Sequence, residues 1–163
     1  AVEIVELPIQ RLLPHQPFQT KTPMLTRLLY VSKPVGPITT HVTASLLENS
    51  RLSNNKSEIT GVLCQGTGIY MQVLEGERSA INALYSRIIA DTRHHQVELL
   101  SFEEVDQRRY GQWSMALVQL SVDDPMVQMA HPEFDPYSAS SKDAMRMVDE
   151  LMNSGTSIQT MSP

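Results

Sequence analysis

Three features are scarce in this sequence: cysteine, long apolar runs and clustered basic charge. The one cysteine, Cys64, lies in an apolar stretch. This excludes a disulfide framework and predicts a reducing, cytoplasmic compartment with Cys64 as a small core residue. No segment approaches the ~18 apolar residues that a membrane-spanning helix needs, so no membrane partner is expected. The 13 Lys and Arg residues are scattered in a chain of net charge −5, which argues against a nucleic-acid-binding surface.

Metal-ligand patterns are also missing. His94 and His95 are adjacent, but the carboxylates around them follow no recurring ligand spacing. We therefore expect no metal site, and we place His95 at the surface.

The length of 163 residues suits one domain with a substantial core and short extensions. Residues 1–23 contain four prolines and no regular period, and they lack the basic start and cleavage site of a signal peptide. We expect them to be a leader-like extension, peripheral to the fold and followed by Met24 as a natural initiator. The principal domain is expected over 24–121, and a helical cap or tail over 122–163.

Residues 66–76, bounded by Gly66 and Gly76, are the clearest strand. Apolar side chains alternate on both of its faces, which is typical of a central strand covered on both sides. Gln72 is the exception. Each unpaired group of a buried amide costs about 1–3 kcal/mol, so a polar partner is expected over Gln72.

The remaining pattern predicts an α+β fold. Strands are expected at 25–32, 59–65, 96–104 and 115–120, and helices at 39–52, 78–90 and from Ser140 or Ser141 to about 153. The order βαββαβ with an added fifth strand indicates a ferredoxin-like sheet with two helices on one face. The C-terminal helix, or else another subunit, is expected to cover the opposite face.

The first helix has an unusual inward stripe. Val42, Leu46, Ser50 and Asn54 recur at near-helical spacing, so the stripe begins apolar and ends in small polar groups. This helix is expected to border something that forms hydrogen bonds.

The second helix carries an apolar stripe that ends at Ile88. Beside it, Arg87, Asp91 and His94 follow at i, i+4 and i+7, which predicts a polar stripe if the helix continues that far.

Five blocks together resemble the BLUF family of flavin-binding blue-light sensor domains. They are LLYVS at 28–32, NNKSEITG at 54–61, QVLEG at 72–76, RHH at 93–95 and WSM at 113–115. The resemblance covers about residues 25–120. It implies non-covalent FAD with its ring between the two helices, and the expected function is sensing rather than enzymatic catalysis.

The resemblance implies that Tyr30 gives an electron and a proton to the excited flavin and that Gln72 bridges Tyr30 to the flavin. Return of both would leave the flavin oxidised and Gln72 rearranged, by rotation, tautomerisation or both. A new hydrogen bond to the flavin carbonyl would then shift absorption to the red.

The resemblance also implies further cofactor contacts. Asn54 matches the asparagine at the pyrimidine edge, and Trp113 and Met115 match a signalling pair, although Trp113 also fits an ordinary core or rim position. The other implied contacts are Leu46, Ser50, Ser53, Arg87, Ile88, Asp91 and His94.

Two positions depart from the family pattern. Ser53 stands where relatives often carry Asn or His, which alters one flavin contact. Glu58 stands where relatives usually place glycine, and that glycine is expected to serve a turn.

Two other functions fit the same fold. An acylphosphatase-like hydrolase would need an arginine-bearing, glycine-rich anion loop, of which residues 33–36 are a poor version. A flavin-independent protein-interaction domain is the other alternative.

The output is expected to be protein contact. Too few residues follow the core for a cyclase or phosphodiesterase domain, and Met145, Met147 and Met152 suggest an adaptable contact surface in the tail. We expect signalling through the C-terminal helix to a downstream protein partner, or through a homo-oligomer of two or more copies.

Overall fold

A computed structural model of the chain describes residues 23–36, 56–66, 68–112, 115–119, 135–153 and 158–159. The strands are β1 (Leu25–Pro34), β2 (Thr60–Gly66), β3 (Ile69–Glu77), β4 (His94–Glu104), β5 (Ala116–Gln119) and β6 (Ile158–Gln159). The helices are α2 (Arg78–Ala90) and α4 (Ser141–Asn153). The helix predicted at 39–52 lies outside the described residues.

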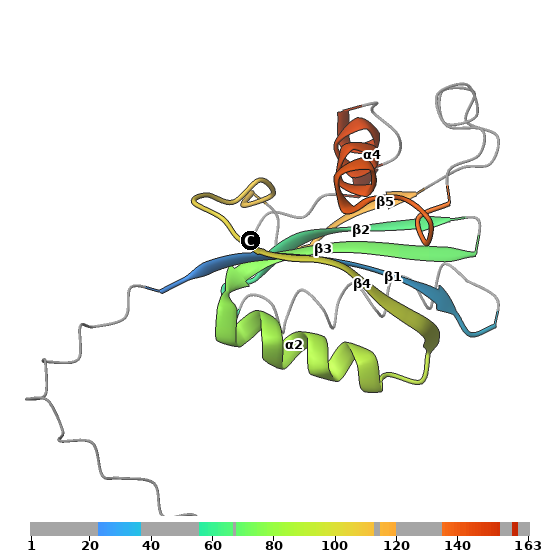
Figure 1. Ribbon diagram of the computed structural model, residues 1–163, viewed down its shortest axis with the longest axis horizontal. Helices are drawn as coiled ribbons and strands as arrows, with labels where there is room; N and C mark the ends of the chain where they lie inside the picture. The colour runs from blue at the N-terminus through green and yellow to red at the C-terminus, as the bar shows by residue number, and fades with distance from the viewer. Residues whose placement is uncertain are drawn as a thin grey trace, which may run out of the picture.

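The strands form one sheet in the order β4-β1-β3-β2-β5-β6. β1 lies between β3 and β4 and is antiparallel to both, β2 and β3 form the predicted hairpin, and β2 is parallel to β5. α2 covers one face and α4 the other (Figure 1). The α+β class and the position of the C-terminal helix are therefore confirmed. β6 was not predicted, because two residues are too short to show a period.

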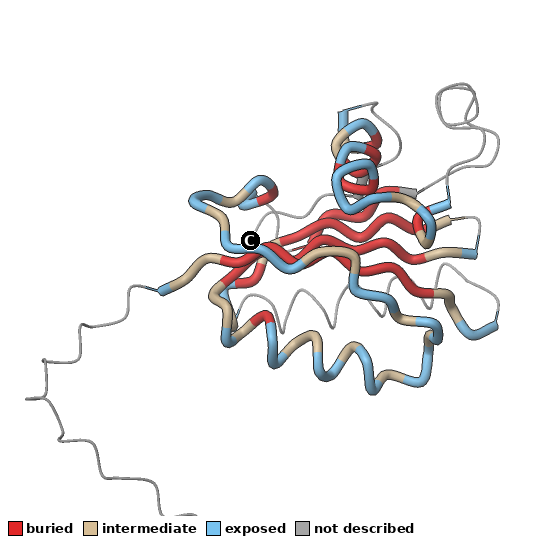
Figure 2. Tube along the Cα trace, viewed as in Figure 1, coloured by how far each residue is buried: buried red, intermediate tan, exposed pale blue. Residues whose placement is uncertain are grey.

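The sheet face under α4 holds a core that the central strands and the helix share. Buried side chains of β1, β2, β3 and β5 pack against those of α4, as the red segments of Figure 2 show. Met145 and Met147 belong to this core, at 9% and 4% exposure. The prediction that they form a free contact surface is wrong, because they lie on the same helical stripe as Ala144, Val148 and Leu151.

The sheet face under α2 holds a second core. Its buried members are Leu28, Tyr30, Ile59, Leu63, Tyr70, Leu74, Ile81, Met115 and Leu117. Only Ile81 of α2 is fully buried, whereas Leu84 and Ile88 pack against this core while partly exposed. α2 therefore lies loosely on its face of the sheet.

Both helices begin at identifiable caps. Glu77 caps α2 by accepting hydrogen bonds from the backbone N–H groups of Ser79 and Ala80, at 2.9 and 3.3 Å. Ser140 caps α4 by accepting from the N–H of Asp143 at 3.1 Å, and its hydroxyl donates to the Asp143 carboxylate at 2.8 Å. Both hydrogen bonds use the Ser140 hydroxyl, and they show that Ser140, one of the two predicted start residues, is the N-cap of α4.

α2 ends at Ala90, with Asp91 as its C-cap in an extended conformation. The helix therefore does not continue to His94, which is the first residue of β4. The predicted polar stripe of Arg87, Asp91 and His94 along one helix is wrong.

Glu58 adopts a φ of 53°, in the left-handed region that favours glycine. Its carbonyl accepts a hydrogen bond from Arg108 Nη2 at 2.7 Å. The turn expected where relatives place glycine is therefore present, and here a residue with a Cβ makes it.

None of the described helices is long and apolar enough to cross a membrane.

Candidate functional site

Tyr30 and Gln72 face each other at the centre of the sheet. They are paired across β1 and β3, so both side chains point to the α2 face. The Tyr30 hydroxyl donates to Gln72 Oε1 at 2.6 Å, and the two residues are only 5% and 7% exposed. The buried amide thus has the polar partner that its position required.

The other end of the amide contacts Met115. Gln72 Nε2 donates to Met115 Sδ at 3.4 Å, and Met115 is fully buried just before β5. Sulfur is a weak acceptor, so this hydrogen bond is weaker than the one from Tyr30. Among the described residues, Gln72 therefore has a strong partner at its oxygen and a weak one at its nitrogen.

Burial raises the pKa of the Tyr30 phenol well above its usual value, and the neighbouring Tyr85 and Asp91 raise it further. The ring of Tyr30 lies 6.0 Å from that of Tyr85 and 6.3 Å, edge to face, from that of His94. Tyr30 is consequently a neutral hydrogen-bond donor in aromatic surroundings.

His94 ties three elements together beside Tyr30. Its Nε2 lies 2.5 Å from the carbonyl oxygen of Ile88, so Nε2 carries a hydrogen and donates it. Its Nδ1 lies 2.9 Å from Ser32 Oγ, which donates when the imidazole is neutral. Both ring nitrogens are thus bound to protein groups, and His94 contributes its ring to the wall around Tyr30.

Asp91 and Arg93 form an ion pair at the turn after α2. Arg93 Nε lies 2.9 and 3.0 Å from the two Asp91 oxygens, and the Arg93 N–H donates to Oδ1 at 2.9 Å. The hydrogen bond from Arg93 lowers the pKa of the Asp91 carboxyl. Sequence reasoning assigned no role to Arg93, although the RHH block contains it. Arg87 lies exposed in the last turn of α2.

The structure thus brings together Tyr30, Gln72 and Met115, with His94 and Ile88 beside them. The predicted contacts Leu46, Ser50, Ser53, Asn54 and Trp113 lie outside the described residues. Among the residues that the structure describes, no group of His, Cys, Asp and Glu is placed to hold a metal ion.

The family model for sensors of blue light using FAD, BLUF, matches residues 25–116. The chain belongs to the BLUF family. The BLUF family is one of flavin-binding blue-light sensors, and the match confirms the resemblance drawn from the five sequence blocks.

Similar proteins include both short BLUF proteins and large cyclases. The alpha subunit of the photoactivated adenylate cyclase of Euglena gracilis is 34% identical over 87 residues, which are 53% of this chain and 8% of that subunit. BlsA in its photo-activated state is 25% identical with a TM-score of 0.73, covering 82% of this chain and 99% of BlsA. BlrB, a BLUF protein in its dark state, is 25% identical with a TM-score of 0.67, covering 79% and 95%.

The BLUF chain thus spans a small fraction of the cyclase subunit that it matches, and nearly the whole of BlsA and BlrB.

Proposed function

We propose that this BLUF chain is a blue-light photoreceptor in which Tyr30 and Gln72 form a light-driven hydrogen-bond switch beside non-covalently bound FAD. The observation that carries the proposal is the 2.6 Å hydrogen bond from the Tyr30 hydroxyl to Gln72 Oε1, buried on the α2 face. FAD would lie on that face, between α2 and the helix predicted at 39–52.

The described residues fit such a cofactor by their chemistry. A flavin ring presents hydrogen-bond acceptors and a donor at its edges, and Gln72 offers both kinds of group from one amide. Tyr30 and Tyr85 add aromatic walls, and Arg87 supplies a positive charge at the end of α2 for an anionic tail. Asn54, Ser53, Ser50 and Leu46 remain proposed contacts from the first helix.

The flavin, when bound and excited by blue light, supplies a one-electron oxidant. Tyr30 gives up an electron, and its phenolic proton leaves through the hydrogen bond toward Gln72, because the bond points from Oη to Oε1. Tyr30 then takes back both the electron and the proton. The chain undergoes no net oxidation, and only the arrangement of the amide changes.

The Gln72 amide has two arrangements that keep a hydrogen bond to Tyr30. A half-turn of the amide places Nε2 beside the Tyr30 hydroxyl and Oε1 beside Met115 Sδ, which exchanges the present donor and acceptor. Tautomerisation moves a hydrogen from Nε2 to Oε1 and leaves the heavy atoms in place. The half-turn only exchanges hydrogen bonds worth about 0.5–1.5 kcal/mol each, so its two states stay close in energy and light can populate the minor one.

The output is proposed to run through the C-terminal helix to a protein partner or to a homo-oligomer of two or more copies, in the cytoplasm. The photoactivated cyclase among the relatives supports an output in which another protein domain responds to the light-induced change in the sensor. The acylphosphatase-like alternative is not favoured, because the family match covers the whole sensor core. The flavin-independent protein-interaction domain is not favoured either, because the family that matches is described as using FAD.

Absorption spectroscopy of the purified protein tests the proposal. We expect a yellow protein that releases FAD on denaturation and whose flavin band shifts reversibly to the red under blue light. A protein that stays colourless when FAD is supplied during refolding would contradict the binding claim. A yellow protein whose spectrum ignores light would contradict the sensor claim alone.

A further inference from the structure

The C-terminal segment is attached to the sheet by two tyrosine hydroxyls, at opposite ends of the sheet. Tyr110, in the loop between β4 and β5, reaches α4, and Tyr137, just before α4, reaches β4. In Figure 1, the β4–β5 loop lies at the left end of the sheet, where β1 begins. Both contacts use a tyrosine hydroxyl as donor, but Tyr110 binds a carboxylate of α4 and Tyr137 binds a backbone carbonyl of β4.

The contact of Tyr110 is with Asp149, a partly exposed residue in the C-terminal half of α4. The Tyr110 hydroxyl donates to Asp149 Oδ1 at 2.5 Å, and Arg109 Nη1 donates to Oδ2 at 2.9 Å. Tyr110 itself is 3% exposed and packs in the α4 core. Burial and the Asp149 carboxylate both raise the pKa of the Tyr110 phenol, so it remains a donor. Two consecutive loop residues therefore hold both oxygens of one helix carboxylate.

The backbone of the same two residues is bound to β3. Glu75 is fully buried and accepts the N–H of Tyr110 at 2.6 Å and that of Arg109 at 2.9 Å. Arg27 Nε and Nη2 each lie 2.9 Å from the same carboxylate. A charged acceptor with this many donors is held firmly, so the loop has a fixed anchor on the strand that carries Gln72.

The loop then runs on to Met115, the weak partner of Gln72. This part of the chain thus makes three kinds of contact. Met115 contacts the Gln72 amide, the backbone of Arg109 and Tyr110 binds Glu75 on β3, and the side chains of the same two residues bind Asp149 on α4. When Gln72 exchanges its donor and acceptor, the N–H···S contact to Met115 is lost. Met115 is then free to shift, and it is joined by the chain to the Tyr110 backbone that Glu75 anchors.

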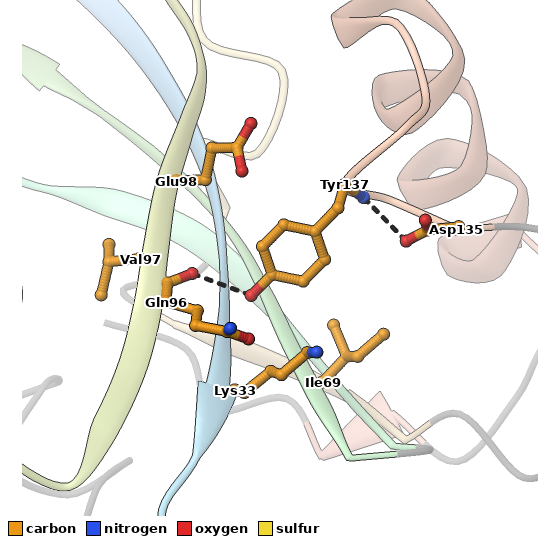
Figure 3. Close-up of a pocket in the computed structure, with 7 residues that line it drawn as sticks. All are labelled: Lys33, Ile69, Gln96, Val97, Glu98, Asp135 and Tyr137. Carbon is orange, nitrogen blue, oxygen red and sulfur yellow. Dashed lines mark hydrogen bonds between the residues drawn. The ribbon is translucent and has the colours of Figure 1, made fainter.

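The contact of Tyr137 is a suitable comparison (Figure 3). Its hydroxyl donates to the carbonyl of Gln96 at 2.8 Å, and Lys33 Nζ lies 5.3 Å from the centre of its ring. These groups line an open cavity of about 480 Å³ at the end of β1 and the start of β4. The carbonyl that it binds belongs to β4, outside the loop that leads to Met115.

We propose that the Tyr110–Asp149 contact is where a change at Gln72 reaches α4, and that Tyr137 only anchors the segment before α4. This inference rests on the proposed photoreceptor function. Because Glu75 fixes the loop backbone, adjustment on the Met115 side turns the side chains of Arg109 and Tyr110 about that anchor. The Tyr110–Asp149 contact is therefore kept in one state of the switch and weakened in the other, while the buried stripe of α4 stays packed on the sheet.

Hydrogen exchange of α4 amides in the dark and under blue light tests this, because exchange reports local release of a helix. The unchanged protein should show a light–dark difference in α4. Tyr110→Phe should keep the full red shift of the flavin and lose that difference. Tyr137→Phe, the matched control, should keep both.

The outcomes separate this inference from the proposed function. No red shift in the unchanged protein would defeat the proposed function itself. A red shift without any light–dark difference in α4, or a difference that survives in Tyr110→Phe, would overturn only the inference. Equal losses in Tyr110→Phe and Tyr137→Phe would also overturn it, because a general loosening of the segment would then explain both. If Tyr110→Phe does not fold, Asp149→Ala removes the acceptor from the helix side instead and should lose the difference in the same way.

Discussion

Gln72 and Glu75 lie three positions apart on β3 and point to opposite faces of the sheet. Gln72 meets Tyr30 on the α2 face, and Glu75 meets Arg27 and the β4–β5 loop on the α4 face. A single strand thus carries the proposed switch residue on one side of the sheet and the anchor of the β4–β5 loop on the other.

Glu75→Gln should lower the free energy of unfolding by about 3–5 kcal/mol, because it removes the buried counter-charge of the Arg27 guanidinium and leaves only the exposed, more distant Glu103. Urea denaturation measures this. Glu103→Gln is the matched control: Glu103 also contacts Arg27, but at 3.5 Å and with a side chain that is 55% exposed, so its loss should cost about 1 kcal/mol or less. Equal costs for the two variants would contradict the role given to Glu75.

Sequence periodicity could predict the strand at 66–76 and the need for a partner at Gln72, because both depend on local alternation. It could not predict the role of Glu75, whose partner Arg27 lies 48 residues away and whose carboxylate reads locally as a surface group. The match to the family pattern found Met115, but not the Tyr110–Asp149 contact, since neither residue stands in a recognised block.

Two errors have clear physical causes. The spacing of Arg87, Asp91 and His94 fits a helix, but Asp91 binds Arg93 and caps α2 instead of continuing it. Met145 and Met147 were judged by residue type, which suggested an adaptable surface. Their helical positions place them on the buried stripe of α4. Position in the helix, and not residue type, therefore determines that they are buried.

Met115→Leu should favour the lit arrangement and slow the return to the dark state. The change removes the sulfur acceptor of Gln72 with little change in volume, so the fold should be kept. A weak hydrogen bond of about 0.5 kcal/mol corresponds to roughly a twofold change in the balance of the two states. Dark recovery of the flavin spectrum measures it. Met71→Leu, buried on the opposite face, should recover at the original rate, and faster recovery in Met115→Leu would count against the proposed dark arrangement.

Glu58→Gly should stabilise the fold slightly. A residue with a Cβ at φ 53° carries a cost of about 1–2 kcal/mol that glycine avoids, and the greater entropy of glycine in the unfolded chain returns about 0.5–1 kcal/mol of this. The thermal midpoint measures the balance. Glu58→Ala keeps the Cβ and removes the same carboxylate, so it should show no such gain. A gain of equal size in Glu58→Ala would refute the backbone explanation.

The red shift should persist at pH 10, where an ordinary tyrosine is half ionised. Burial raises the pKa of Tyr30 above its usual value of 10.0, so the neutral donor is present throughout the lower range and is lost only as pH rises through that raised pKa. Recording the size of the light-induced shift against pH in the folded protein tests this. A midpoint of loss near pH 10 would show that Tyr30 is not shielded as the structure indicates.

The light-minus-dark flavin spectrum of Tyr30→Phe tests the central claim most directly. The substitution removes only the hydroxyl that donates to Gln72, so flavin should stay bound while the reversible red shift is abolished. Tyr85→Phe removes the hydroxyl of the neighbouring ring, whose centre lies 6.0 Å from the centre of the Tyr30 ring. The flavin of this variant should show a normal red shift. A reversible red shift of normal size in Tyr30→Phe would contradict the account.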